Sequence, residues 1–140
     1  MDKNRFEKVR KTSRGINSPY DAFTNALVVI ATRSHELIIS PAAYRALGEP
    51  TGITIYNNST EFALEGIHYD IYDPELFKVQ ALSKNPKRAP FRRIAALSWT
   101  ENNLVIGGVY VGHKEDGRFL SFRKSAQQVI PMPTYNRKKT

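Results

Sequence analysis

The sequence contains no cysteine and no apolar run long enough to cross a bilayer. Without cysteine the chain cannot form disulfide bonds, cysteine-ligated zinc sites or a thiol nucleophile, and this composition fits a reducing compartment. The longest apolar run covers only residues 26–31, whereas a membrane-spanning helix needs about 18 apolar residues. The first residues are polar and charged, so we expect no signal peptide, no membrane partner and a cytoplasmic protein.

The sequence also lacks the motifs of common catalytic sites. There is no G-x-S-x-G nucleophile motif and no phosphate-binding loop, because Gly107, Gly108 and Gly112 have the wrong spacing. The three histidines are far apart, and none has a partner at a fixed offset: His35, His68 and His113. We therefore expect no enzyme, no catalytic residue and no cofactor.

One acidic stretch has the composition of a possible metal site. Residues 68–75 contain one imidazole and three carboxylates, at His68, Asp70, Asp73 and Glu75. A calcium loop needs a denser, regular series of oxygen ligands with a central glycine, and zinc prefers more nitrogen or sulfur ligands. The stretch meets neither pattern, so we expect no metal.

Basic residues are scarce in the middle of the chain and abundant at both sides of it. Residues 15–83 carry three Lys and Arg against eight Asp and Glu, a net charge of −5. Residues 1–14 carry +4 and residues 84–140 carry +9, which gives the total of +8. This asymmetry indicates a polyanionic partner, although solvated surface segments would have the same composition.

Two basic segments are the candidate nucleic-acid-binding elements. Residues 1–19 form a flexible basic arm of the kind that follows a nucleic-acid backbone. Residues 83–93 hold five basic residues and two prolines with no acid, a composition suited to lying along phosphates. The candidate contact residues are Lys3, Arg5, Lys8, Arg10, Lys11 and Arg14 in the arm, and Lys84, Lys87, Arg88, Arg92 and Arg93 in the second segment.

Residues 27–67 form a unit with clear local signals at each joint. Two apolar strands flank the polar turn at residues 33–36, and two more flank Asn57-Asn58-Ser59-Thr60, where asparagines tolerate the positive φ of tight hairpins. Between them, Ser40 is an N-cap and Pro41 the first helical residue, while Gly48 suits a left-handed C-cap. The pattern predicts a β-β-α-β-β unit.

The stretches LIISPAAYRALG and TGITIYNNSTEFALEG make this unit similar to the AbrB/SpoVT-type swapped-hairpin family. The resemblance covers about residues 27–67. It implies a homodimer that exchanges hairpins and binds DNA through basic residues near the first hairpin. Only Arg33, in the first hairpin turn, matches such a basic position here.

The second half predicts a related β-α-β-β unit within residues 76–123. Its expected elements are strands at 76–82, 104–111 and 118–123, and a helix at 91–100, although 95, 97 and 99 also alternate as in a strand. A degenerate internal duplication would follow. We therefore expect an α+β fold, mostly β with two short helices, in one small barrel-like domain over residues 20–124. A basic disordered tail would occupy residues 125–140.

These features together predict a nucleic-acid-binding protein, for DNA rather than RNA, and more narrowly a small transcriptional regulator. Exposed aromatic residues could stack on unpaired bases if the target is single-stranded: Tyr20, Phe91 and Tyr135. The alternative is a protein-interaction module, of the type found in phages and mobile elements, that docks a basic face on an acidic partner protein.

Overall fold

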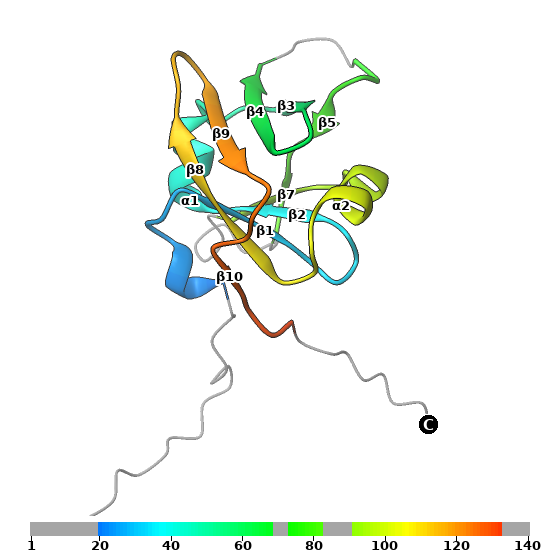
Figure 1. Cartoon of the computed structure of the whole chain (residues 1–140). Coiled ribbons are helices and arrows are strands. Elements are labelled where there is room, and N and C mark those ends of the chain that lie inside the picture. Colours follow the sequence, from blue (N-terminus) through cyan, green and yellow to red (C-terminus); the bar gives the residue numbers. More distant parts are fainter. Residues whose placement is uncertain (1–19, 69–72, 83–90, 133–140) are drawn as a thin grey trace, which may run out of the picture.

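The computed structural model describes residues 20–68, 73–82 and 91–132 (Figure 1). Within these ranges the chain forms ten strands, two α-helices and the 3₁₀ helix η2 (Asp21–Phe23). The helices are α1 (Pro41–Ala46) and α2 (Leu97–Asn103). The strands are β1 (Val28–Ala31), β2 (Leu37–Ile39), β3 (Gly52–Asn57), β4 (Glu61–Ile67), β5 (Phe77–Lys78), β6 (Gln80–Ala81), β7 (Arg92–Ile94), β8 (Gly108–Lys114), β9 (Phe119–Arg123) and β10 (Gln128–Val129).

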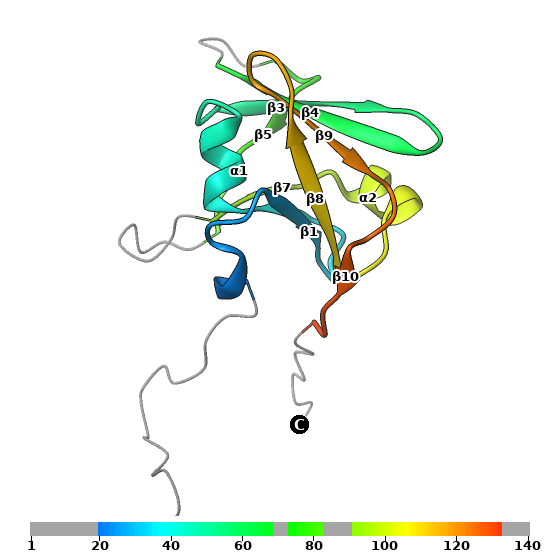
Figure 2. The ribbon, with the colours of Figure 1, turned by 60° about the vertical axis from the view of Figure 1, so that its left-hand side comes forward.

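The strands form one antiparallel sheet that nearly closes on itself. Its order is β5-β3-β4-β9-β8-β1-β2-β7-β6, and β10 pairs with β8. The two ends of this path, β5 and β6, are separated in the chain only by Val79, whose N–H donates to the Thr51 carbonyl at 3.0 Å. The long strand β8 pairs with β1 along its first part and with β9 along its second (Figure 2). The result is a mostly β, barrel-like α+β fold.

The pairing scheme joins the two halves of the chain repeatedly. Each of β1, β2, β3 and β4 has one partner among these four strands and another from β5 to β9. The first half has the order β1-β2-α1-β3-β4. In the second half the segment of β5 and β6 corresponds to β1, and β7, α2, β8 and β9 correspond to β2, α1, β3 and β4 in turn. If each strand is replaced by its counterpart in the other half, every pair of hydrogen-bonded strands among them becomes a pair that is also present in the sheet. The strand pairing is therefore symmetric between the halves.

Alternating side chains divide the apolar residues between two clusters. The inner core fills the space enclosed by the sheet and consists of Val29, Ala31, Leu37, Ile39, Ala43, Leu47, Ile53, Phe62, Leu64, Ile94, Ala96, Leu104, Tyr110, Leu120 and Phe122. A second group, here called the outer cluster, lies on the opposite face of β1, β2 and β8. It consists of Val28, Ile30, Ile38, Phe91, Val109 and Met132, with Tyr20, Phe23, Ala26, Leu82 and Ile130 packed against them.

Ser40 joins the first strand to the first helix. Its hydroxyl accepts from the Ala43 N–H at 3.1 Å as the N-cap of α1, accepts from the Val28 N–H at 3.4 Å, and donates to the Ala26 carbonyl at 2.5 Å. The side chain is 1% exposed. The predicted helix over Pro41 is confirmed, and its end is confirmed at Gly48, where φ is +85°.

The helix predicted at residues 91–100 is present, but it starts later than predicted. Residues 92–94 form β7, which pairs with β2, and α2 begins only at Leu97. The spacing of Phe91, Ile94 and Ala95 is that of a helix, but hydrogen bonding to β2 holds the first part of this segment extended. Tertiary pairing overrides the local preference here. The alternative of a continuous strand is wrong, since strand and helix follow one another.

Three further boundaries differ from expectation. The predicted strand at 76–82 is broken at Val79 into β5 and β6, which pair with β3 and β7. The strand expected from residue 104 begins at Gly108. The predicted disordered tail starts too early, because β10 pairs with β8 and Met132 is 8% exposed within the outer cluster.

The second hairpin turn is where it was predicted, but it closes by another mechanism. Among the described residues, neither Asn57 nor Asn58 has a positive φ. Instead the Asn58 Oδ1 atom accepts from the backbone N–H of Glu61 at 2.7 Å and of Thr60 at 2.9 Å. This is an Asx turn, in which the side chain replaces a backbone acceptor.

None of the helices in the described ranges is long and apolar enough to cross a membrane.

Replacing Ser40 with Ala should lower the free energy of unfolding by about 1–2 kcal/mol, because a helix cap and two further hydrogen bonds at a buried position are lost. Urea unfolding measures this change. Ser59→Ala is the control, since Ser59 is an exposed turn residue and its loss should cost less than about 0.5 kcal/mol. Equal effects of the two substitutions would contradict the role given to Ser40.

Replacing Gly48 with Val should also destabilise the fold, because a β-branched residue is strained at φ +85° by about 1–2 kcal/mol. A Cβ atom at this position would also lie 2.8 Å from Arg118 Cδ. Gly117→Val is the matched control, since Gly117 has φ +69° and a Cβ atom added there would meet nothing within 4 Å. Thermal melting of both variants separates backbone strain from crowding, and an unchanged melting temperature for Gly48→Val would refute the left-handed cap.

Candidate nucleic-acid interface

The structure describes three of the twelve predicted contact residues. Arg33 lies in the turn between β1 and β2, and Arg92 and Arg93 lie in β7. The other nine fall outside the described residues: Lys3, Arg5, Lys8, Arg10, Lys11, Arg14, Lys84, Lys87 and Arg88.

Arg92 and Arg93 point to opposite faces of the sheet, as successive strand residues do. Arg93 is in register with Ile38 of the outer cluster, and its Nη1 atom lies 3.5 Å from Glu36 Oε1 in a half-exposed ion pair. Arg92 is in register with the inner-core residue Ile39, and its guanidinium lies 4.5 Å from the centre of the Tyr44 ring. The two arginines therefore do not present one continuous basic surface.

Arg33 is exposed at the tip of the first hairpin. The turn that carries it is held by Thr32, whose backbone N–H donates to the Glu36 carbonyl at 2.9 Å and whose hydroxyl accepts from the Glu36 N–H at 3.0 Å. His35 in the same turn has φ +66°. Arg33 is thus presented to solvent by a well-bonded turn.

The described part of the chain is not basic overall. It contains nine Lys and Arg against ten Asp and Glu, a net charge of −1. The remaining residues hold twelve basic and three acidic side chains, a net charge of +9. Their basic residues lie in three ranges: 1–19, 83–90 and 133–140. The positive charge of the protein therefore comes from three segments that adjoin the described fold.

All three basic segments join the fold at the outer cluster. Tyr20 directly follows residues 1–19, Leu82 and Phe91 flank residues 83–90, and Met132 directly precedes residues 133–140. Each of these four residues belongs to the outer cluster or packs against it. In Figures 1 and 2 the first described residues (blue) and the last (red) lie at the same end of the molecule, away from β3 and β4.

Direct contacts hold these attachment residues together. The rings of Tyr20 and Phe91 have their centres 6.2 Å apart, and the Tyr20 hydroxyl lies 3.9 Å from the sulfur of Met132. Burial, and then the negative charge of Glu36, raise the pKa of the Tyr20 phenol above its ordinary value. Tyr20 therefore stays neutral at physiological pH, as suits a partly buried anchor.

Sequence reasoning located the basic segments but missed their anchors. A signal was present: an aromatic or apolar residue stands at the inner border of each segment, at Tyr20, Leu82, Phe91 and Met132. Phe91, a candidate for base stacking on its sequence context, is only 6% exposed. Its ring is used in the outer cluster and has no free face for a base.

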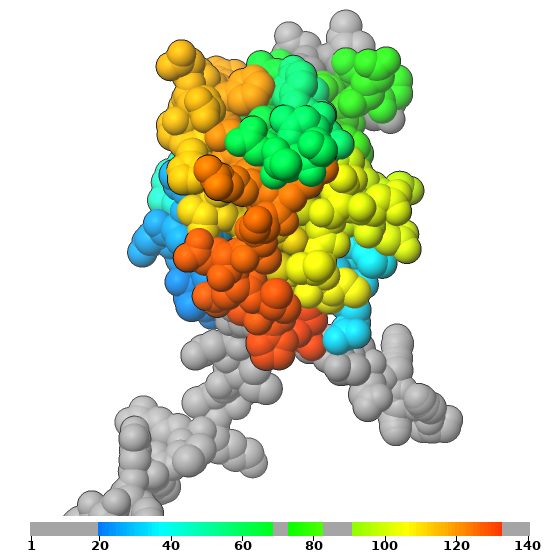
Figure 3. All heavy atoms as spheres, in the orientation of Figure 1, coloured from blue at the N-terminus to red at the C-terminus, as the bar shows by residue number. Residues whose placement is uncertain are grey.

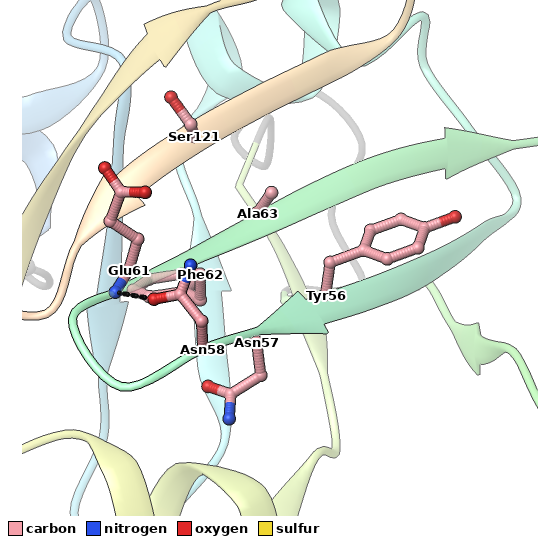
Figure 4. Close-up of a pocket in the computed structure, with 7 residues that line it drawn as sticks. All are labelled: Tyr56, Asn57, Asn58, Glu61, Phe62, Ala63 and Ser121. Carbon is pink, nitrogen blue, oxygen red and sulfur yellow. Dashed lines mark hydrogen bonds between the residues drawn. The ribbon is translucent and has the colours of Figure 1, made fainter.

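A separate hollow lies at the tip of the β3–β4 hairpin (Figure 4). It measures about 140 Å³ and is lined by Tyr56, Asn57, Asn58, Glu61, Phe62, Ala63 and Ser121. Its polar groups are largely engaged within the protein, because Asn58 closes the turn and the Tyr56 hydroxyl donates to Glu65 at 2.7 Å. That hydrogen bond raises the pKa of the Tyr56 phenol. Glu61 is the only carboxylate among these lining residues.

The described ranges hold no group of three or more His, Asp or Glu side chains placed to bind a metal ion. Asp73 and Glu75 of the acidic stretch are exposed, and the Asp73 carboxylate accepts from the Glu75 N–H at 2.9 Å in a turn. Asp70 lies outside the described residues.

No protein-family model, curated protein or solved structure matches the chain.

Replacing Phe91 with Ala should lower the free energy of unfolding by about 3 kcal/mol, because a buried ring leaves a cavity in the outer cluster. Leu97→Ala is the control, since Leu97 is 49% exposed and should cost less than about 1 kcal/mol. Chemical denaturation measures both variants. A Phe91→Ala protein as stable as Leu97→Ala would mean that Phe91 does not anchor this region.

Proposed function

We propose that the protein binds nucleic acid, DNA rather than RNA, through three basic segments that act on one ligand. One observation carries the proposal: the residues that border all three segments meet in the outer cluster. Residues 1–19, 83–90 and 133–140 carry net charges of +4, +3 and +3. Segments attached at one end of the molecule would supply a positive charge that the described part, with its net charge of −1, does not have.

The binding mode that fits best is contact with phosphates. Lys and Arg side chains neutralise backbone phosphates without reading the base sequence. The burial of Phe91 removes one of the three aromatic candidates for stacking, and Tyr20 packs on it. Affinity would therefore come mainly from the basic segments. Among the described residues, the exposed Arg33 and the half-exposed Arg93 are the candidates for additional phosphate contacts.

We further infer that the fold is a duplicated form of the swapped-hairpin arrangement. The symmetric pairing of the two halves supports this inference, because two copies of a β-β-α-β-β unit could pair in the same way. One chain would then supply both halves of an assembly that related proteins would build as a homodimer, and dimerisation would not be required. A small transcriptional regulator would suit such a chain.

The alternative is a protein-interaction module that docks its basic segments on an acidic partner protein. The exposed apolar residues around α2 favour it, since large apolar side chains at a surface are typical of protein contacts. Leu97, Val105 and Ile106 are 49%, 52% and 41% exposed. A module of this kind would not bind free DNA at physiological salt.

Fluorescence anisotropy with labelled mixed-sequence DNA tests the proposal. If about six phosphates are contacted, affinity for duplex DNA should fall roughly a thousandfold between about 50 and 200 mM salt. Replacing Lys84, Lys87 and Arg88 with Ser should weaken binding at low salt and reduce the salt slope by up to about 3. This variant leaves Arg92 and Arg93 in place, because both make contacts within the fold.

The matched control replaces Arg45, Lys78 and Arg118 with Ser. It removes the same charge from exposed positions outside the outer cluster. If both triple variants lose affinity equally, the segment has no special role and only net charge matters. If the unaltered protein fails to bind either duplex or single-stranded DNA at about 50 mM salt, the nucleic-acid proposal is wrong, and an acidic protein partner becomes the hypothesis to test by pull-down.

A further inference from the structure

A second hollow on the described surface has a lining unlike the first. It measures about 220 Å³ and is lined by Val111, His113, Arg123, Ser125 and Gln127. Val111 and His113 are two residues apart in β8 and so share a face. Arg123 is the last residue of β9, and Ser125 and Gln127 follow on the way to β10. Figure 3 shows this connection (orange to red) on the outside of the molecule.

The polar groups of this hollow are all able to donate hydrogen bonds. They are a guanidinium, an imidazole, a hydroxyl and a carboxamide, and no carboxylate is among the lining residues. An arginine fork with additional donors around it is the usual protein surface for a planar or tetrahedral oxyanion. The volume is sufficient for a phosphate group together with a few water molecules.

These donors are not used elsewhere in the described part of the chain. The side chains of His113, Arg123, Ser125 and Gln127 make no hydrogen bond or ion pair with other described residues. Neighbouring polar residues differ in this respect: the Ser121 hydroxyl donates to Glu115 at 2.7 Å, and the Lys124 ammonium donates to Asn103 at 2.8 Å. The hollow thus gathers donors that are free to bind a ligand.

Two acidic residues lie beside the hollow. The Glu115 carboxylate accepts from the Ser121 hydroxyl at 2.7 Å, and Ser121 is the register partner of His113. Glu61 is the register partner of Arg123 across β4 and β9, but the two do not form an ion pair within the described structure. In Figure 4 the Glu61 carboxylate extends toward Ser121. Its negative charge should weaken anion binding, so its removal provides a test in the opposite direction.

The hollow borders the end of the molecule where the basic segments join. Val109 belongs to the outer cluster, and Val111 follows two residues later on the same face of β8. Two residues span about 7 Å along a strand. An anion in the hollow would therefore sit beside the outer cluster.

We propose that this hollow binds a phosphate group, with Arg123 providing the charge and His113, Ser125 and Gln127 providing further hydrogen bonds. The group can belong to a nucleic-acid backbone or to a free phosphate, since the recognising chemistry is the same. The site consists only of described residues and does not depend on the proposed DNA binding.

Titration of the ¹⁵N-labelled full chain with inorganic phosphate, followed by NMR, tests the site. Backbone signals of residues 111–113 and 123–127 should shift with phosphate and not with chloride at the same ionic strength. Replacing Arg123 with Gln should weaken phosphate binding roughly tenfold or more, because a charge-assisted hydrogen bond is lost. Arg45→Gln is the control for net charge, since Arg45 is exposed on α1, and its affinity should stay close to that of the unaltered protein.

Glu61→Gln should bind phosphate more tightly than the unaltered protein. Shifts that chloride reproduces, or equal affinities of the Arg123→Gln and Arg45→Gln proteins, would overturn the proposal. The two phosphate sources are separated by DNA anisotropy: a severalfold loss for Arg123→Gln assigns the site to the nucleic-acid backbone, and no loss assigns it to free phosphate. A protein that binds no DNA but shows the localised phosphate shifts would refute the proposed function and leave this site standing.

Discussion

The constraint on which this structure depends is that neither half of the chain can complete its own sheet. β1, β2, β3 and β4 each have one strand partner within their half and one in the other half. A half alone would leave the unpaired edges of these strands without hydrogen-bond partners. The single residue Val79, between β5 and β6, lets one segment pair with both ends of the sheet. The inner core is enclosed only when both halves are present.

The elements that could be predicted from the sequence are those with local signals. Ser40, Pro41 and Gly48 define a helix by capping chemistry that needs no distant partner. β7 could not be predicted in this way, because Arg92 and Ile94 are extended through pairing with β2, more than fifty residues earlier in the chain. β10 was not predicted for the same reason, because its two residues form a strand only through pairing with β8. Pairing between distant segments overrides weak local preference.

The candidate interface shows the same division between local and distant information. Charge is visible in the sequence, so the basic segments could be identified residue by residue. The sequence could not show that the three segments join the fold at one place, because the residues that border them are neighbours only in the folded chain. These residues are Tyr20, Leu82, Phe91 and Met132. The donor-lined hollow was also missed, since His113, Arg123, Ser125 and Gln127 come from two strands and the segment that follows them. Arg92 and Arg93 are adjacent in sequence, but their side chains lie on opposite faces of the sheet because successive strand residues alternate in direction.

The outer cluster has a consequence for how strongly short basic segments can act. A segment with a charge of +3 or +4 binds a polyanion weakly when it is free in solution, and three free segments would each bear the full entropic cost of association. Under the proposed function, attachment to one cluster would make the second and third contacts intramolecular, at an effective concentration that depends on segment length and not on protein concentration. If the proposed function holds, the apolar contact between Tyr20, Phe91 and Met132 would supply avidity, although none of these residues carries a charge.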